Sequence, residues 1–256
     1  MDYIDITLLV VGGFMAGVIN TVAGNGSAIT LTVLMATGLD ATVANATNRI
    51  GVFAQTLTAV LSLNKSNRTK KLTKDSVWFY LPTILGSIAG ALLASDFDEE
   101  KLKMVIGFFM IILLITMLLK PKRWLINTDS SKKKKTPLNF VIFFAIGVYG
   151  GFIQMGIGIM ILSSLVLLAQ YSLRDANIIK LWVAFIMILP AFVIFIISGK
   201  IEWIPGLVLA VGAALGARFG AKYVLYHPKA NTIIRYVLIA IISVAVFRIF
   251  YPMLAN

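Results

Sequence analysis

Hydrophobic residues in this chain are gathered into long stretches that hold few charged side chains. The stretches cover residues 4–37, 43–63, 77–95, 104–119, 139–170, 177–198, 203–221 and 233–251. Polar and charged residues are concentrated in the short segments between them. A helix of about 20 apolar residues crosses the hydrocarbon core of a bilayer, so the pattern predicts an all-α polytopic membrane protein.

The two longest stretches, 4–37 and 139–170, each exceed a single crossing and each contain two glycines spaced two residues apart. These glycines are Gly24 and Gly26 in the first stretch, and Gly156 and Gly158 in the second. Glycine adopts left-handed backbone conformations without a steric penalty, so we expect each stretch to form a broken helical hairpin, either re-entrant or fully crossing. Broken hydrophobic segments at corresponding positions of two halves point to the binding site of a secondary transporter.

The charge of the loops predicts how the chain is oriented in the membrane. The sequence has 23 Lys and Arg against 11 Asp and Glu, which gives a net charge of +12. The basic residues gather in segments 64–76, 120–138 and 218–235, and the positive-inside rule places such segments in the cytoplasm. Both termini then lie outside, and topology explains the basic charge without a nucleic-acid partner.

With this orientation the chain divides into two transmembrane repeats of inverted topology. Residues 1–126 and 138–256 each contain one broken or re-entrant hairpin and three further transmembrane helices. Residues 127–137 form a basic cytoplasmic linker between the repeats.

Two smaller motifs recur in both repeats and support this division. An Ala-Asn pair follows the glycine pair at the same distance in each half, ending at Asn45 and at Asn177. A Gly-x-x-x-Gly motif also occurs in each half, at Gly86 and Gly90 and at Gly212 and Gly216. Small residues at this spacing let helices approach closely.

The tips of the two hairpins are the best candidates for a binding site. A helix that begins after each break would direct free main-chain N–H groups and the positive end of its dipole toward the membrane centre, where they attract an anion. Neutral donors near the breaks, and polar or cationic residues at the starts of the following helices, would complete the site. The candidates for substrate binding are Asn20, Thr21, Gly24, Asn25, Gly26, Ser27, Asn45, Asn48, Arg49, Gln154, Gly156, Gly158, Asn177 and Lys180.

The positions of the charged residues favour an anionic ligand. Every Asp and Glu lies in a loop, at the end of a span or near the N-terminus, whereas a cation carrier normally needs a carboxylate within the membrane. Arg49 and Lys180 fall several residues inside predicted helices. Snorkelling of these side chains to the interface, and helix packing at the glycines, are the structural alternatives.

The sequence lacks the residue patterns of an enzyme or a metalloprotein. It has no cysteine and one histidine, His227, which lies in a basic loop. It contains no His-Glu-x-x-His motif, no paired carboxylates and no Ser-His-Asp pattern. We therefore expect no catalytic residue, no metal and no cofactor.

These motifs together resemble the TauE/SafE-type sulfite exporter family, also called TSUP, over essentially the whole chain. The matching residues are Ala16-Gly17, Ala23-Gly24-Asn25-Gly26, Ala44-Asn45-Ala46-Thr47, Gly150-Gly151, Gly156-Ile157-Gly158 and Ala176-Asn177. The resemblance implies a permease for sulfite, sulfonates such as sulfoacetate, or related small anions, in a bacterial inner membrane. It also implies export rather than import.

We therefore expect a secondary transporter that moves a small anion, such as sulfite or an organosulfonate, by alternating access between the two repeats. A passive anion channel is one alternative, and a permease for a different small carboxylate or sulfur-containing anion is another. The expected partners are the anionic substrate and the lipid bilayer, without nucleic acid. Assembly into a homo-oligomer is compatible with the sequence but not required by it.

Overall fold

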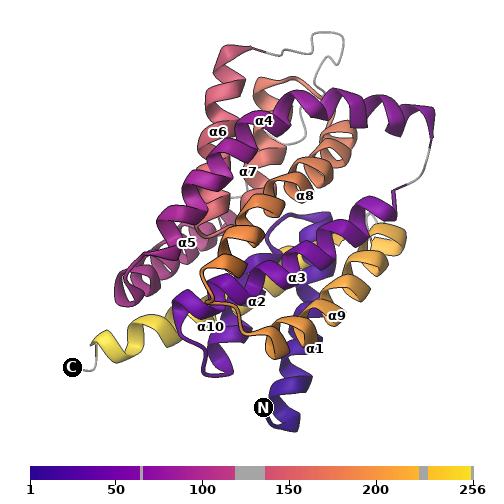
Figure 1. Cartoon of the computed structure of the whole chain (residues 1–256). Coiled ribbons are helices and arrows are strands. Elements are labelled where there is room, and N and C mark those ends of the chain that lie inside the picture. The colour runs from indigo at the N-terminus through magenta and orange to yellow at the C-terminus, as the bar shows by residue number, and fades with distance from the viewer. Residues whose placement is uncertain (64–65, 119–135, 225–229, 255–256) are drawn as a thin grey trace.

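The computed structural model describes residues 1–63, 66–118, 136–224 and 230–254, and within these ranges the regular elements are all helices (Figure 1). Most of the linker 127–137, as well as His227, lies outside the described residues. The prediction of an all-helical membrane protein is confirmed. In the described part of the chain, four helical segments are long and apolar enough to cross a membrane, namely Tyr3–Val22, Asn67–Ser95, Leu173–Ile197 and Trp203–Tyr223.

The described helices follow the hydrophobic stretches of the sequence, and both of the longest stretches are divided. The first half contains α1 (Tyr3–Val22), α2 (Gly26–Ala36), α3 (Ala41–Leu61), α4 (Asn67–Ser95) and α5 (Glu99–Leu118). The second half contains α6 (Pro137–Phe152), α7 (Ile157–Ser163), the π-helical η3 (Ser164–Leu168), α8 (Leu173–Ile197), α9 (Trp203–Phe219), the π-helical η4 (Gly220–Val224) and α10 (Ala230–Leu254).

Hydroxyl side chains explain where several helices begin. The hydroxyl oxygens of Ser66, Thr136 and Ser172 accept hydrogen bonds of 3.2, 3.3 and 3.2 Å from main-chain amides three residues later. Each bond satisfies one of the amides that have no partner inside the first turn of a helix. Helices α4, α6 and α8 therefore start at defined residues.

Helices α1 and α9 are in direct main-chain contact, although they belong to different halves of the chain. A Cβ atom added to Gly13 or Gly17 of α1 would overlap main-chain atoms of α9. In the same way, a Cβ atom at Gly212 or Gly216 of α9 would overlap main-chain atoms of α1. At these four positions the seam has no room for a side chain.

Helices α4 and α6 form a second seam of the same kind. Gly86 and Gly90 of α4 lie against the main chain of α6 between Phe144 and Phe152, and Gly147 and Gly151 of α6 lie against Thr83 and Ser87 of α4. The two Gly-x-x-x-Gly motifs of the sequence thus both serve close helix packing, and each packs across the two halves.

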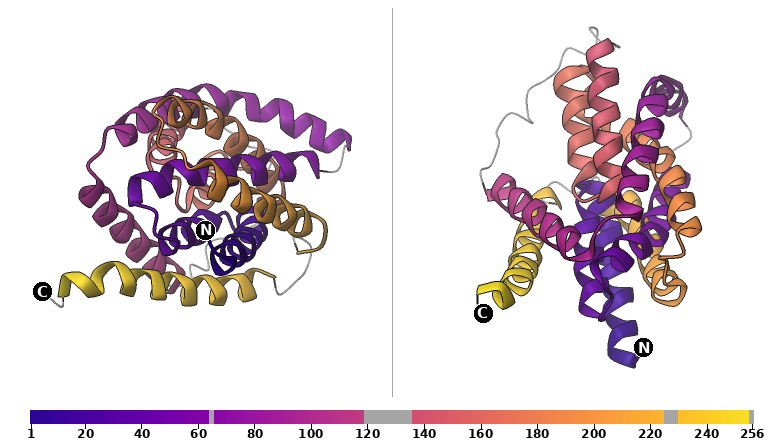
Figure 2. Two further views of the ribbon diagram at one scale, coloured as in Figure 1. Left: turned by 60° about the horizontal axis from the view of Figure 1, so that its bottom comes forward. Right: turned by 60° about the vertical axis from the view of Figure 1, so that its left-hand side comes forward.

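Further helix contacts also join helices of the first half to helices of the second half. Helix α3 packs against α9, helix α8 packs against α4, and α3 and α8 pack against each other. Helices α5 and α10 pair at the edge of the bundle, as the two views of Figure 2 show. The two halves of the sequence are therefore interlocked in space.

Candidate functional site

The chain breaks at the glycine pairs, as the sequence predicts. Residues 23–25 separate α1 from α2, and residues 153–156 separate α6 from α7. Gly24 and Gly156 have φ angles of +83° and +71°, and Gln154 also has a positive φ of 67°. A left-handed conformation is uncommon for a glutamine, so the second break depends on surrounding contacts as well as on its glycine.

The two breaks meet. The main-chain amide of Gly158 donates a hydrogen bond of 3.1 Å to the carbonyl oxygen of Gly24. A Cβ atom on either glycine would overlap the main chain of the other. The expectation that the N–H groups at the start of each second arm are free is therefore wrong for Gly158, because its amide is used to join the two tips.

Arg49 lies fully buried on α3 and binds the end of α6. Its Nη1 donates to the carbonyl oxygen of Gly150 at 2.8 Å and to Oε1 of Gln154 at 2.9 Å. Its Nη2 donates to the carbonyl oxygens of Gly151 and Phe152 at 2.9 and 3.1 Å. The last carbonyls of a helix have no partner inside the helix and form the negative end of its dipole, so the guanidinium caps α6 where the chain breaks.

Asn45 and Phe195 complete the surroundings of Arg49. The Asn45 amide nitrogen donates to the carbonyl oxygen of Phe152 at 2.8 Å, and its Oδ1 accepts from Nη2 of Arg49 at 3.3 Å. The Arg49 guanidinium carbon lies 4.9 Å from the centre of the Phe195 ring, within the range of a cation–π contact. Only the Nε–H of Arg49 lacks a described partner.

Lys180 makes a corresponding contact at the first break. This side chain of α8 is also almost fully buried, and its Nζ donates to the carbonyl oxygen of Thr21 at 3.1 Å, in the last turn of α1. Each buried cation thus reaches from one half of the chain to the broken helix of the other half. Snorkelling does not account for either side chain in this structure, because both are enclosed by protein.

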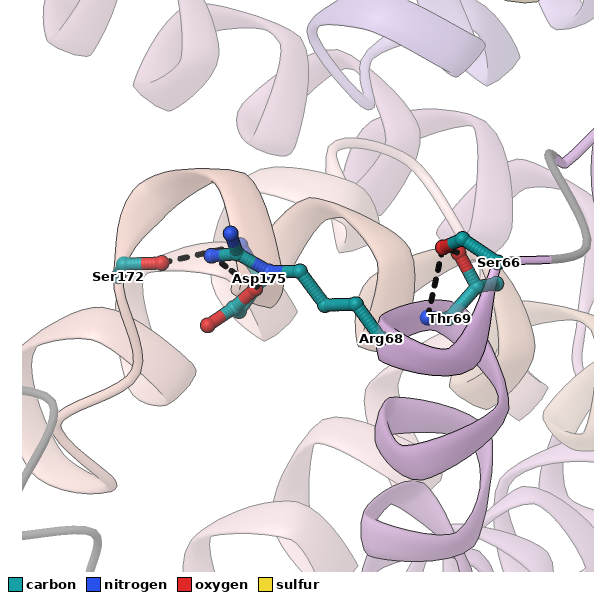
Figure 3. Close-up of polar contacts among 5 residues, drawn as sticks. All are labelled: Ser66, Arg68, Thr69, Ser172 and Asp175. Carbon is teal, nitrogen blue, oxygen red and sulfur yellow. Dashed lines mark hydrogen bonds and ion pairs between the residues drawn. The ribbon is translucent and has the colours of Figure 1, made fainter.

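Neither buried cation is paired with a carboxylate in the part of the chain that the structure describes. An ion pair in this part of the chain joins Arg68 of α4 to Asp175 of α8, with 2.8 Å between Arg68 Nη2 and Asp175 Oδ1 (Figure 3). Over the same residues, no group of three or more His, Asp or Glu side chains is arranged to hold a metal ion.

Several buried amide groups among the predicted site residues have no described hydrogen-bond partner. Both amide atoms of Asn25 and of Asn48 are in this state, and so are Nε2 of Gln154 and Oδ1 of Asn177. Asn25 is the residue before α2 and makes no side-chain cap bond to that helix. Buried polar groups are almost always hydrogen-bonded, so these side chains are available to a polar ligand.

The other predicted site residues lie at the same breaks but mostly serve the helices themselves. Thr21 Oγ1 donates to the Gly17 carbonyl oxygen of its own helix at 2.8 Å. A Cβ atom at Gly26 would overlap the Ala16 carbonyl oxygen and approach the Asn20 side chain. Ser27 is buried in the first turn of α2. Asn48 and Asn177 are placed on α3 and α8, but no described hydrogen bond ties them to the breaks.

The main-chain acceptors at the end of α6 and the ring of Phe195 were not among the predicted site residues. The Gly150-Gly151 pair was the only sequence signal for them, because it marks where α6 ends. Gln55 of α3 is a further buried amide whose two polar atoms have no described partner.

Comparison with known proteins identifies the family. The sequence profile described as "Sulfite exporter TauE/SafE" matches residues 9–249 of the chain. A "Probable membrane transporter protein" of Haemophilus influenzae is 30% identical over 226 residues, which cover 87% of this chain and 86% of that protein. "Probable membrane transporter protein YfcA" of Escherichia coli K12 is 26% identical over 93% of this chain and 86% of its own length.

No solved structure matches the chain. The matched range includes both breaks and both buried cations. The chain therefore belongs to the TauE/SafE sulfite exporter family and is an integral membrane protein of a transporter family.

Proposed function

We propose that the protein is a secondary transporter of a small anion, and that the anion binds where the two broken helices cross. The observation that carries this proposal is the burial of Arg49 and Lys180 beside the breaks, without a carboxylate partner among the described residues. A buried charge is costly unless it is compensated. A bound anion would supply that compensation, because the buried carboxylate of α8, Asp175, is paired with Arg68 and not with either of these cations.

The unpartnered amides add neutral donors to the proposed site. Asn25, Asn48 and Gln154 present amide nitrogens that have no described acceptor, and an oxyanion could accept hydrogen bonds from them. Asn25 also stands at the N-terminal end of α2, where free main-chain amides and the helix dipole favour negative charge. Of the candidates named from the sequence, we propose that Asn25, Asn48, Gln154 and Lys180 contact the anion. The others, among them Arg49 and Gly158, hold the two breaks in place.

We further propose that the two halves are inverted repeats with re-entrant hairpins. The pairing of α1 with α9 and of α3 with α9 corresponds to the pairing of α6 and α8 with α4. Helix α2 has 11 residues, which span about 17 Å at 1.5 Å per residue and are too few to cross a hydrocarbon core of about 30 Å. The basic loops support an orientation with both termini outside, in a bacterial inner membrane.

The family description and the positive site together favour sulfite or an organosulfonate such as sulfoacetate as the substrate. These anions carry several oxygen acceptors on one centre, which suits a site that offers several amide and ammonium donors. We propose alternating access to this site, with export as the direction, and the word exporter in the family description supports that direction.

The two cations have different roles in this proposal. Four N–H groups of Arg49 are directed at carbonyl and amide oxygens of the protein, so Arg49 positions the end of α6. Lys180 makes one described hydrogen bond, and the ammonium group has three donors. Lys180 is therefore the cation that binds the substrate.

Transport assays in liposomes test this proposal. Purified wild-type protein should show saturable sulfite or sulfoacetate counterflow, and thermal shift should show binding of the same anions. Lys180→Met should weaken binding about 10- to 100-fold, since hydrogen bonds to charged groups contribute about 1.5–3 kcal/mol, whereas Lys180→Arg should retain part of the affinity. The exposed Lys222 provides the control variant Lys222→Met.

Two results would contradict the proposal. Unchanged affinity in Lys180→Met would remove Lys180 from the site. Anion conductance in a planar bilayer without counterflow would identify a channel instead of a carrier.

A further inference from the structure

The contacts between helices define two bundles that do not coincide with the two halves of the sequence. Bundle A consists of α1, α2, α3 and α9, and bundle B consists of α4, α6, α7 and α8. Each bundle takes one helix from the other half of the chain, α9 in bundle A and α4 in bundle B. We propose that these exchanged bundles, rather than the sequence halves, are the rigid bodies that move against each other during transport; this inference rests on the proposed function.

The seams inside the bundles are made by main-chain contact. Gly212 and Gly216 hold α9 against α1, and Gly86 and Gly90 hold α4 against α6, in each case with glycines on the facing helix as well. Small residues let helices approach closely, and at these glycines the facing main chains are already in contact, so relative movement of the two helices would break many contacts at once. A conformational change is therefore expected to leave both seams intact.

Polar contacts also join α8, together with the residues just after it, to α4 at three points along the length of α4. Arg68 pairs with Asp175 at the beginning of both helices (Figure 3). Ser87 Oγ donates to the carbonyl oxygen of Met187 at 2.7 Å near the middle. Beyond the end of α8, Lys200 Nζ donates to the carbonyl oxygen of Ser95, the last residue of α4, at 2.5 Å. Bundle B is thus held at three levels.

The interface between the bundles is formed mainly by side chains, in contrast to the main-chain contacts of the two glycine seams. It consists largely of side chains of α3 and α8, including Phe53, whose ring stacks on Phe192 at 5.5 Å between centroids and approaches Phe185 at 6.1 Å. The described polar links across it are those of Asn45, Arg49 and Lys180 and the Gly158–Gly24 bond, and all four lie at the breaks. The proposed substrate site therefore lies between the bundles, where relative motion would open it to one side or the other.

The connection from α8 to α9 must absorb part of this motion, because it passes from bundle B to bundle A. Within it, the Lys200 side chain is bound to α4 and the Glu202 amide donates to Thr47 Oγ1 of α3 at 3.0 Å. The crossing point is thus at Ile201. Gly199, two residues earlier, has a φ of +67° and open space around its Cβ position.

Cysteine cross-linking distinguishes the exchanged bundles from the sequence halves, and the chain contains no cysteine of its own. The pair Arg68→Cys with Asp175→Cys joins α8 to α4 inside bundle B. The pair Phe53→Cys with Phe192→Cys joins α8 to α3 between the bundles. Both pairs link the first half of the sequence to the second, so motion of the halves would be blocked by either one.

With a short bis-methanethiosulfonate reagent, we expect the 68–175 cross-link to leave sulfite counterflow within twofold of the uncross-linked protein. The 53–192 cross-link should reduce it at least tenfold, and reduction with dithiothreitol should restore it. Inhibition by both cross-links, or by neither, would overturn the inference. Absence of counterflow before cross-linking would count against the proposed substrate and not against the exchanged bundles.

Distances between spin labels test the exchanged bundles without any substrate. Spin labels on the exposed residues Leu93 and Val141 report on bundle B, and labels on Leu93 and Leu207 report across the interface. The 93–141 distance distribution should be narrow, and the 93–207 distribution should be broader or show two components. Equal widths for the two pairs would overturn the inference.

Discussion

Gly158 and Gly24 touch main chain to main chain at the point where the two broken helices cross, and a hydrogen bond of 3.1 Å joins the amide of the first to the carbonyl of the second. The contact places both breaks at one point of the fold. Gly24 must be glycine both because its φ is positive and because a side chain would not fit. Gly158 has an ordinary negative φ, so at this position glycine is required for space alone.

Replacing Gly158 by alanine should therefore disturb the crossing. Overpacking costs about 1–3 kcal/mol where neighbours can adjust, and here the neighbour is main chain, so we expect a loss of at least about 3 kcal/mol in the free energy of unfolding. Thermal unfolding in detergent measures it. Gly38→Asn is the control, because Gly38 has open space around it and asparagine tolerates its positive φ; equal melting temperatures for the two variants would contradict the prediction.

Loss of Arg49 should destabilise the protein more than it weakens anion binding. Arg49→Gln leaves the Gly150 and Gly151 carbonyls without their donor and the Phe152 carbonyl with Asn45 alone, and unsatisfied buried groups cost about 1–3 kcal/mol each. We expect a reduction of about 3 kcal/mol or more in the free energy of unfolding. The exposed Arg218→Gln should change stability by less than about 0.5 kcal/mol. A stable Arg49→Gln protein that no longer binds sulfite would instead make Arg49 a direct ligand.

The two glycine seams should respond alike to substitution. Gly90→Leu inserts a side chain between α4 and α6, and Gly216→Leu does so between α1 and α9. Both should abolish the folded monomer on size-exclusion chromatography, because no main-chain atom at either seam can move aside without parting the helices. Leu93→Ala, on the exposed face of α4, should elute as the wild type does.

The ion pair between Arg68 and Asp175 should contribute little to stability. The Arg68 side chain is 56% exposed, and exposed pairs contribute about 1 kcal/mol or less. A double-mutant cycle with Arg68→Gln and Asp175→Asn should give a coupling energy of that size, which falls at high salt. A coupling several times larger would make the pair a principal link of α8 to α4.

The sequence predicts those features that depend on residue type and spacing within one segment. Apolar stretches locate the helices, the glycine pairs locate the breaks, and an arginine and a lysine inside apolar helices mark buried cations. The positive φ of Gln154 was not predictable, because glutamine rarely adopts it and the Gln154 side chain is held by Arg49, 105 positions away in the sequence. The acceptors of Arg49 are main-chain carbonyls, which every residue carries and no side-chain pattern reveals.

The sequence also did not predict which helices pack against each other. A Gly-x-x-x-Gly motif predicts close approach, but not which helix approaches. Gly86 and Gly90 face Gly147 and Gly151 only because α4 lies beside α6 in the fold. The expectation that each repeat forms its own moving unit followed from chain order, whereas the packing in this structure crosses between the repeats.

The exchange of α4 and α9 has a consequence for biosynthesis. When the ribosome has completed residues 67–95, the glycine face of α4 has no partner, because α6 begins only at Pro137. The same holds for α1, because its glycines have no partner until α9 (Trp203–Phe219) has been synthesised. Neither glycine seam of the nascent first half can therefore form until the second half is being made, and neither half expressed alone can form either seam.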